Sequence, residues 1–365
     1  MSKTEPKELR RGWTTGACAT AAAKAAFTAL QYGTFPDPVA ITLPKGGTAD
    51  FVLTRHGLSN GSAFATITKD AGDDPDVTHG ALITSTVRML ASGEGVRFKA
   101  GEGVGTVTRP GLPIPPGEPA INPVPRQMIE TALSEAAATL GVAPDAEVEI
   151  SIEGGAELAL KTMNARLGIV GGLSVLGTTG IVRPFSCAAW IASIHRGIDV
   201  ARAVGLNHVV GATGSASEDA VRSRYSLDET AYLDMGDFAG GLLKYLRLHP
   251  VEKLTLSGGF AKFSKLAHGA LDLHSGRSSV DFGFLQDLLT EAGASPSLVA
   301  DAATANTAKE VLDRSREEEL DLSRLLARRT KQEVRQILRD APIALEVLIT
   351  DRDGAILGES GFDED

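Results

Sequence analysis

The sequence predicts two domains of different architecture: an α+β domain over residues 1–160 and an α/β domain with Gly-rich loops over residues 161–365. Three observations support this prediction. The 365 residues exceed the usual length of one domain. The first half mixes strand and helix patterns without a regular order. The second half repeats a strand–turn–helix unit, which is typical of a largely parallel sheet flanked by helices.

The first half begins with an Ala-rich segment, and a helix is expected over residues 14–30. Thr14 or Thr15 can cap it, because a hydroxyl oxygen accepts a hydrogen bond from the first helical turn. Alternating polar and apolar residues then predict strands. The proline-rich stretch 110–125 predicts an extended connection before a helix at 126–140. The expected strands and extended segments are 39–43, 49–55, 62–69, 81–89, 95–109 and 146–152.

In the second half, each apolar strand is expected to lead through a short turn into a helix. The clearest case is the strand 206–211, which is followed by the turn Gly211–Ser215 and a helix near 216–225. A helix is also expected to start near Ser186. The other expected strands are 230–234, 252–256, 297–300, 343–350 and 355–357, and the other expected helices are 237–247, 260–269, 281–292 and those within 306–340.

Composition excludes several classes of function. The net charge of −10 and an aromatic content of 5% argue against a nucleic-acid partner. The sequence lacks an apolar run long enough to span a membrane. Its first residues are charged and do not resemble a secretory signal, so a cytoplasmic location is expected. Cys18 and Cys187 are too few for a disulfide framework and are expected to be small buried thiols.

Glycine and hydroxyl residues are concentrated between Gly171 and Gly180. Such a segment lets a backbone approach another group closely. Two interpretations are equally supported: the amides and hydroxyls line a ligand pocket, or two elements cross there without intervening side chains. Arg183 and Ser186 follow directly, and a guanidinium matches carboxylates in bidentate geometry.

The turn after strand 206–211 is the second candidate site, because it opens a helix and directs backbone N–H groups toward a ligand. Asp234 ends the next expected strand, where an acidic residue commonly binds ribose hydroxyls; its alternative role is a helix N-cap. The spacing of Gly211 and Gly214 departs from the dinucleotide fingerprint, which counts against an oxidoreductase. The predicted cofactor-binding residues are Gly211, Thr213, Gly214, Ser215 and Asp234.

Several further blocks occur in a fixed order along the chain. Together with the Gly-rich segments, they are similar to the CbiD family, the cobalt-precorrin-5B C-1 methyltransferases of anaerobic cobalamin synthesis. The resemblance extends from about Arg11 to about Asp281, and the tail beyond residue 290 contributes no matching block. The blocks are RGWTTGACATAAAK from Arg11, KDAGDDPDVT from Lys69, GEGVGTVTRPGL from Gly101, INPVPR from Ile121 and LSGGFAKFSKLAHGALDLHS from Leu256.

The resemblance implies methyl transfer from S-adenosylmethionine to C-1 of cobalt-precorrin-5B, which gives cobalt-precorrin-6A. Cobalt arrives within the substrate, so no metal site of the protein is expected. An anionic tetrapyrrole requires cations, and Lys262, Lys265 and His268 share one helix face that is expected to meet solvent or an anionic ligand. Arg196 also suits a helix C-terminus. The predicted substrate-binding residues are Thr14, Thr15, Arg183, Ser186, Arg196, Lys262, Lys265 and His268.

If a proton leaves the ring, a carboxylate or histidine can accept it, and the candidates are His195, His274 and Asp74. Asp74 belongs to an acidic cluster over residues 70–76, for which Asx-turns, a cation site and a general base are the alternatives. Two alternative functions remain: a dinucleotide-dependent oxidoreductase and a non-catalytic carrier of corrin intermediates. The sequence is compatible with a homo-oligomer and with transient contacts with other cobalamin-pathway enzymes.

Overall fold

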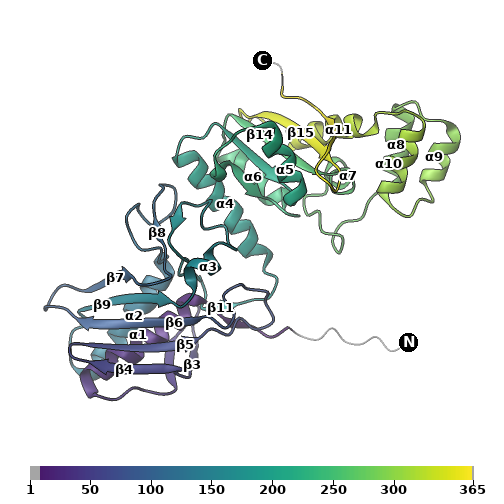
Figure 1. Cartoon of the computed structure of the whole chain (residues 1–365). Helices are drawn as coiled ribbons and strands as arrows, with labels where there is room; N and C mark the ends of the chain where they lie inside the picture. Colours follow the sequence, from purple (N-terminus) through teal and green to yellow (C-terminus); the bar gives the residue numbers. More distant parts are fainter. Residues whose placement is uncertain (1–8, 364–365) are drawn as a thin grey trace, which may run out of the picture. The chain divides into compact units, whose positions relative to one another are not determined.

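The computed structural model describes residues 9–363; the charged segment 1–8, which enters the prediction about a secretory signal, lies outside the described residues. The chain divides into two compact units, Met1–Cys187 (unit 1) and Ala188–Asp365 (unit 2), which differ in colour in Figure 1. The predicted boundary at residue 160 falls too early. The segment that follows it pairs with strands of unit 1: β10 (Ile169–Val170) with β8 (Thr106–Val107), and β11 (Ile181–Val182) with β1 (Gly12–Trp13).

Two helices of 18 residues pack against each other in unit 1, α1 (Thr15–Tyr32) and α2 (Pro123–Leu140). As predicted, Thr14 caps α1: its hydroxyl oxygen accepts from the N–H of Ala17 at 3.2 Å. The alanines of α1 are buried against β5 and β6, because small side chains let the helix lie close to the sheet. Helix α2 begins before the predicted residue 126, since proline is tolerated in a first helical turn.

The main sheet of unit 1 has the order β4-β5-β6-β9-β7, and only the β7–β9 pair is parallel. In β9, buried and half-buried residues alternate strictly, so one face of the strand meets the core. The alternating patterns read from the sequence are confirmed as strands here. The elements are β2 (Val39–Thr42), β3 (Thr48–Phe51), β4 (Arg55–Ser59), β5 (Ser62–Thr68), β6 (Leu82–Met89), β7 (Val96–Ala100), β9 (Ala146–Ile152) and α3 (Gly155–Ala159).

Unit 2 contains the predicted parallel sheet, in the order β13-β12-β14-β15-β16. The first four strands are parallel and β16 is antiparallel. Val209 of β12 faces the larger apolar core, whereas the adjacent Val210 packs with Val221 of α5 on the opposite face. The sheet is therefore covered on both sides, as the α/β pattern predicts. The strands are β12 (His208–Ala212), β13 (Tyr232–Asp234), β14 (Lys253–Gly259), β15 (Ala344–Thr350) and β16 (Ile356–Glu359).

The helices of unit 2 mostly follow the predicted positions, and Figure 1 shows α8, α9 and α10 as neighbours. One prediction is wrong: the segment expected as a strand at 297–300 is helical. Ser295 caps this helix by accepting from the N–H of Leu298, and Pro296 occupies its first turn. The helices are α4 (Cys187–Ala203), α5 (Ser215–Arg224), the 3-10 turn Glu229–Ala231, α6 (Ala239–Leu248), α7 (Phe260–Ala267), α8 (Phe282–Glu291), α9 (Pro296–Ala302), α10 (Ala308–Glu317) and α11 (Leu322–Leu338).

Candidate functional site

The strand order of unit 2 reverses at β12. The chain passes from β12 to β13 on one side and then returns to β14 on the other side. Ligands of open α/β sheets bind outside the carboxyl ends of the strands at such a reversal. At this edge β12 leads into α5 and β14 leads into α7, and no side chain caps the N-cap residues Gly214 and Gly259. Backbone N–H groups at the N-termini of α5 and α7 therefore lie at this edge without a side-chain cap.

The turn after β12 is fixed by hydrogen bonds to neighbouring strands. The backbone N–H of Thr213 donates to the carbonyl of Ser257 at 3.0 Å. The Thr213 hydroxyl lies 3.5 Å from that of Ser217, which lies 3.2 Å from the Thr350 hydroxyl. All of these side chains are buried. The turn is therefore held against the ends of β14 and β15 before any ligand binds.

Lys262 of α7 also reaches this turn. Its ammonium group donates to the carbonyl of Thr213 at 3.0 Å and lies 3.1 Å from Oδ1 of Asp237. Asp234 is paired in register with Ala212 at the end of β12, and its carbonyl accepts from Trp190 Nε1 at 3.0 Å. The structure thus assembles the predicted Thr213, Gly214, Ser215, Asp234 and Lys262 at one edge of the sheet.

Gly211 lies elsewhere, inside β12 rather than in the turn. A Cβ at this position would meet the side chain of Leu242 and, at 3.0 Å, that of Leu256. The absence of a side chain here allows α6 to pack closely on the strand. Packing therefore accounts for this glycine without a ligand.

The predicted cationic face of α7 is only partly present. Lys265 is 7% exposed and donates to the carbonyls of Leu273 and Ser278, so the expectation that it meets solvent or an anionic ligand is wrong. Burial lowers its pKa. The reason is local: the chain after α7 folds back and buries its backbone carbonyls against the lysine. His268 stacks on Phe284 with ring centroids 5.2 Å apart, and His274 lies exposed in the loop.

His195 and Arg196 lie on α4 and have partners within unit 2. The His195 ring stacks on Tyr245 at 4.0 Å, and its Nε2 lies 3.2 Å from the carbonyl of Gly241. Arg196 pairs with Asp199 at 2.8 Å, and the Tyr245 hydroxyl donates to the same carboxylate. Burial, together with this hydrogen bond, raises the pKa of Tyr245. Because Nε2 of His195 faces a carbonyl, Nδ1 is the nitrogen left to accept a proton.

In unit 1, the segment Gly171–Gly180 crosses other backbone at contact distance. A Cβ on Gly172 would overlap the backbone of Gly103, and one on Gly177 would overlap the side chain of Thr14. The N–H of Thr14 donates to the carbonyl of Gly180 at 3.0 Å. These contacts support the interpretation as a tight crossing. Thr14 and Thr15 are buried beneath it, whereas Arg183, directly after β11, is exposed.

The acidic loop over residues 70–76 uses its carboxylates within unit 1. Asp70 pairs with Arg10 through both oxygens, which lowers the pKa of Asp70. Its Oδ1 also accepts from the N–H of Gly72, and Asp76 accepts likewise from Thr78, so the expected Asx-turns are confirmed. Asp74, a candidate base, accepts from the backbone N–H of Phe185 at 2.8 Å.

Some residues of these regions were not predicted. Ser217, Ser257 and Thr350 support the turn after β12, but only the strand order brings Thr350 there. Trp190 lies in the helix expected from Ser186, and its indole N–H donates to the carbonyl of Asp234 at the end of β13. Phe185 was not predicted either, because no local pattern indicates its positive φ.

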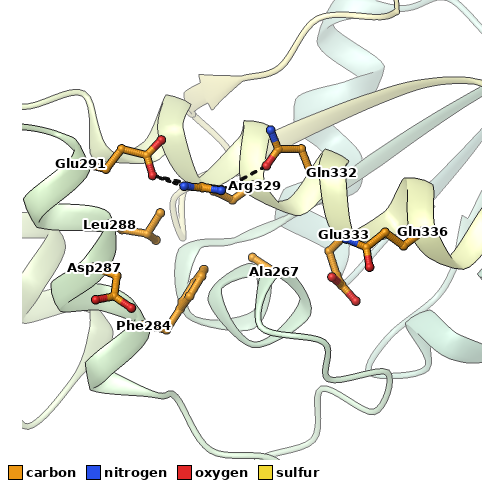
Figure 2. Close-up of a pocket in the computed structure, with 9 residues that line it drawn as sticks. All are labelled: Ala267, Phe284, Asp287, Leu288, Glu291, Arg329, Gln332, Glu333 and Gln336. Atoms are coloured by element: carbon orange, nitrogen blue, oxygen red, sulfur yellow. Dashed lines mark hydrogen bonds and ion pairs between the residues drawn. The ribbon is translucent and has the colours of Figure 1, made fainter.

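A separate hollow of about 290 Å³ lies between α7, α8 and α11 (Figure 2). Figure 2 shows Arg329 extended between Glu291 and Gln332, with which it forms hydrogen bonds. Asp287 and Glu333 also line the hollow. A lining with three carboxylates and one guanidinium does not suit an anionic tetrapyrrole.

Within residues 9–363, no group of three or more His, Cys, Asp or Glu side chains is arranged to hold a metal ion. Across the same part of the chain, no helix is long and apolar enough to cross a membrane.

Comparison with known proteins gives matches along the chain. The CbiD family model matches residues 2–184, and the model for the CbiD C-terminal domain matches residues 272–361. A protein of Brucella anthropi named cobalt-precorrin-5B C(1)-methyltransferase is 61% identical over 353 residues, which cover 97% of this chain and 96% of that protein. A Bradyrhizobium protein of the same name is 58% identical over 352 residues, or 96% of this chain and 94% of its own.

A crystal structure of a cobalamin biosynthesis protein (CbiD) from Archaeoglobus fulgidus is also similar. It has 24% sequence identity and a TM-score of 0.40, and the match covers 85% of each chain. The matches to family models and to relatives of high identity lead to one conclusion. The chain belongs to the CbiD family.

Proposed function

We propose that this protein methylates C-1 of cobalt-precorrin-5B to give cobalt-precorrin-6A in anaerobic cobalamin biosynthesis. One observation carries the proposal: relatives named for this reaction are about as long as this chain and are 61% identical to it in the case of the Brucella anthropi protein. Identity of this extent spans both units.

We propose S-adenosylmethionine as the methyl donor and the carboxyl edge of the unit 2 sheet as its site. The donor supplies a sulfonium methyl group, and the electron pair of the broken carbon–sulfur bond stays on sulfur while C-1 supplies the pair for the new bond. The residues of the edge fit such a ligand. A ribose diol is a donor for the carboxylate of Asp234, and a carboxylate group suits Lys262 and the free N–H groups at Gly214 and Ser215.

The protein's contribution in this proposal is alignment and electrostatics rather than a covalent intermediate. The rigid turn at Thr213 keeps the donor site in one geometry. As ligands of the substrate's carboxylates we propose Arg183, Ser186, Arg196 and His268. Lys265 leaves this set because its ammonium group is engaged by backbone carbonyls.

His195 and His274 remain the proposed proton acceptors, and cobalt enters only with the substrate. Asp74 is a weaker candidate because one of its oxygens holds a backbone N–H. We propose a cytoplasmic location for the enzyme. Assembly into a homo-oligomer and transient contact with other enzymes of the pathway remain predictions from the sequence.

Calorimetric titration with S-adenosylhomocysteine tests the donor site. We expect Asp234→Ala to weaken binding by about 10- to 100-fold, as for loss of a hydrogen-bonded charged partner. The matched control is Asp219→Ala, which removes an exposed carboxylate from α5 and should leave affinity unchanged. Unchanged affinity of Asp234→Ala would refute the placement of the site. Tighter binding of a nicotinamide dinucleotide than of S-adenosylhomocysteine would instead support an oxidoreductase.

A further inference from the structure

Phe185 has a backbone conformation that its side chain disfavours. Its φ of 55° places it in the left-handed region, where the Cβ of an L-residue crowds the following carbonyl. Two other non-glycine residues among those described share this property, Glu319 and Arg339. Both lie at the ends of helices, α10 and α11, where a left-handed residue is the usual way to terminate a helix. Phe185 ends no helix; it lies between β11 and α4.

Packing does not explain the conformation either, because Phe185 is 65% exposed. Instead, a side chain from a distant loop forms a hydrogen bond with the backbone of Phe185. The carboxylate of Asp74 accepts from the N–H of Phe185 at 2.8 Å. The loop that carries Asp74 is itself fixed, since the N–H of Asp73 donates to the carbonyl of Arg10 at 2.9 Å and Asp73 accepts from the N–H of Arg10 at 2.7 Å. Backbone strain of this kind is typical of a functional position.

The neighbours of Phe185 indicate the chemistry of a ligand. Arg183 is exposed two positions earlier, and its guanidinium suits a carboxylate. An exposed aromatic face beside an exposed guanidinium matches a flat conjugated ring with carboxylates at its rim. From this geometry we infer that Phe185 is a binding residue that stacks on the macrocycle of the substrate, and that Asp74 is a positioning residue that presents its ring. The inference rests on the proposed function.

The test is the KM for cobalt-precorrin-5B and the kcat in a methyl-transfer assay with the full chain. An aromatic contact of this kind corresponds to a 2- to 12-fold change, so Phe185→Ala should raise KM by about that factor with little change in kcat. Phe185→Trp should keep a low KM. Asp74→Ala should raise KM like Phe185→Ala, and Asp74→Asn should restore it, because the amide oxygen still accepts the backbone N–H.

Stability provides a second measurement with its own control. Phe185→Gly relieves the strained φ, so Tm should rise by about 2–4 °C while KM rises. Glu319→Gly relieves the same strain at a helix end and should raise Tm without affecting KM. Tyr32→Ala removes a comparably exposed aromatic from unit 1 and should also leave KM unchanged.

The outcomes separate this inference from the proposed function. If the unaltered enzyme methylates cobalt-precorrin-5B and the Phe185 variants keep its KM, the inference is refuted and the proposed function stands. A change in the KM for S-adenosylmethionine alone would also refute it, since the ring would then contact the donor. If the unaltered enzyme does not act on cobalt-precorrin-5B, the proposed function fails and the inference fails with it.

Discussion

Acid is expected to destabilise unit 2 through His208. This histidine begins β12 and is 7% exposed. Its Nε2 lies 2.8 Å from the Thr255 hydroxyl, which donates to Glu346 at 3.0 Å and therefore accepts from the histidine. The neutral ring with its proton on Nε2 satisfies this chain of hydrogen bonds. Burial, and then the nearby charge of Lys253, lowers the pKa of His208 from 6.5 to about 4.

The sign of the effect follows from proton uptake. Between pH 6.5 and pH 4 the unfolded chain binds a proton at this residue and the folded chain does not, so the free energy of unfolding falls as the pH falls. Each pH unit within this window contributes about 1.4 kcal/mol, which gives an upper limit of about 3 kcal/mol from pH 7 to pH 4. Above pH 6.5 the contribution of His208 is fully present.

Urea denaturation at a series of pH values measures this effect. With Trp13→Phe as background, the fluorescence of Trp190 reports unit 2 alone, because the chain has two tryptophans. His208→Gln keeps a donor for Thr255 but cannot titrate. We expect the variant to lose less stability than the parent between pH 6.5 and pH 4, while carboxylates contribute equally to both. Equal pH dependence in the two proteins would refute the reasoning.

Two further substitutions test the packing around the site regions. Gly12→Ala should lower the free energy of unfolding of unit 1 by about 1–3 kcal/mol, because the added Cβ would overlap the backbone of Ala71. Urea denaturation followed by Trp13 fluorescence in a Trp190→Phe background measures this change. An unchanged urea midpoint would contradict the contact. Lys265→Met should lower the free energy of unfolding by about 1–3 kcal/mol and speed proteolysis of the loop 270–279, since the carbonyls of Leu273 and Ser278 lose a donor. Lys309→Met, at a surface ion pair, serves as its control, and equal proteolysis of the two variants would contradict the role of Lys265.

Local patterns predicted most elements of the fold. The Ala-rich composition and Thr14 predicted α1, and alternation predicted the strands of unit 1. The repeated strand–turn–helix order predicted the parallel sheet. The prediction of a strand at 297–300 was wrong because so few residues show no clear hydrophobic periodicity. A serine before a proline is nevertheless a helix-start signal. The predicted domain boundary was too early because β10 and β11 have two residues each, and strands this short are identified only by the strands with which they pair.

The candidate site was predictable where sequence neighbours form it. The turn at Thr213–Ser215 follows a strand and opens a helix, so its position could be read directly. Lys262 could be selected as a cation, but its placement beside Thr213 depends on the order of β12 and β14. Lys265 shows the limit of helical spacing, since a chain that folds back over a helix face buries a residue that the spacing would leave exposed. The conformation of Phe185 likewise depends on contacts that are distant in sequence.

The most direct test of the central claim is a methyl-transfer reaction with cobalt-precorrin-5B and S-adenosylmethionine that carries a carbon-13 methyl group. Mass spectrometry and NMR spectroscopy of the product would locate the label. The proposed function predicts one labelled methyl group, bonded to C-1, and formation of S-adenosylhomocysteine in equal amount. A product without the label, or with the label on another carbon, would contradict it.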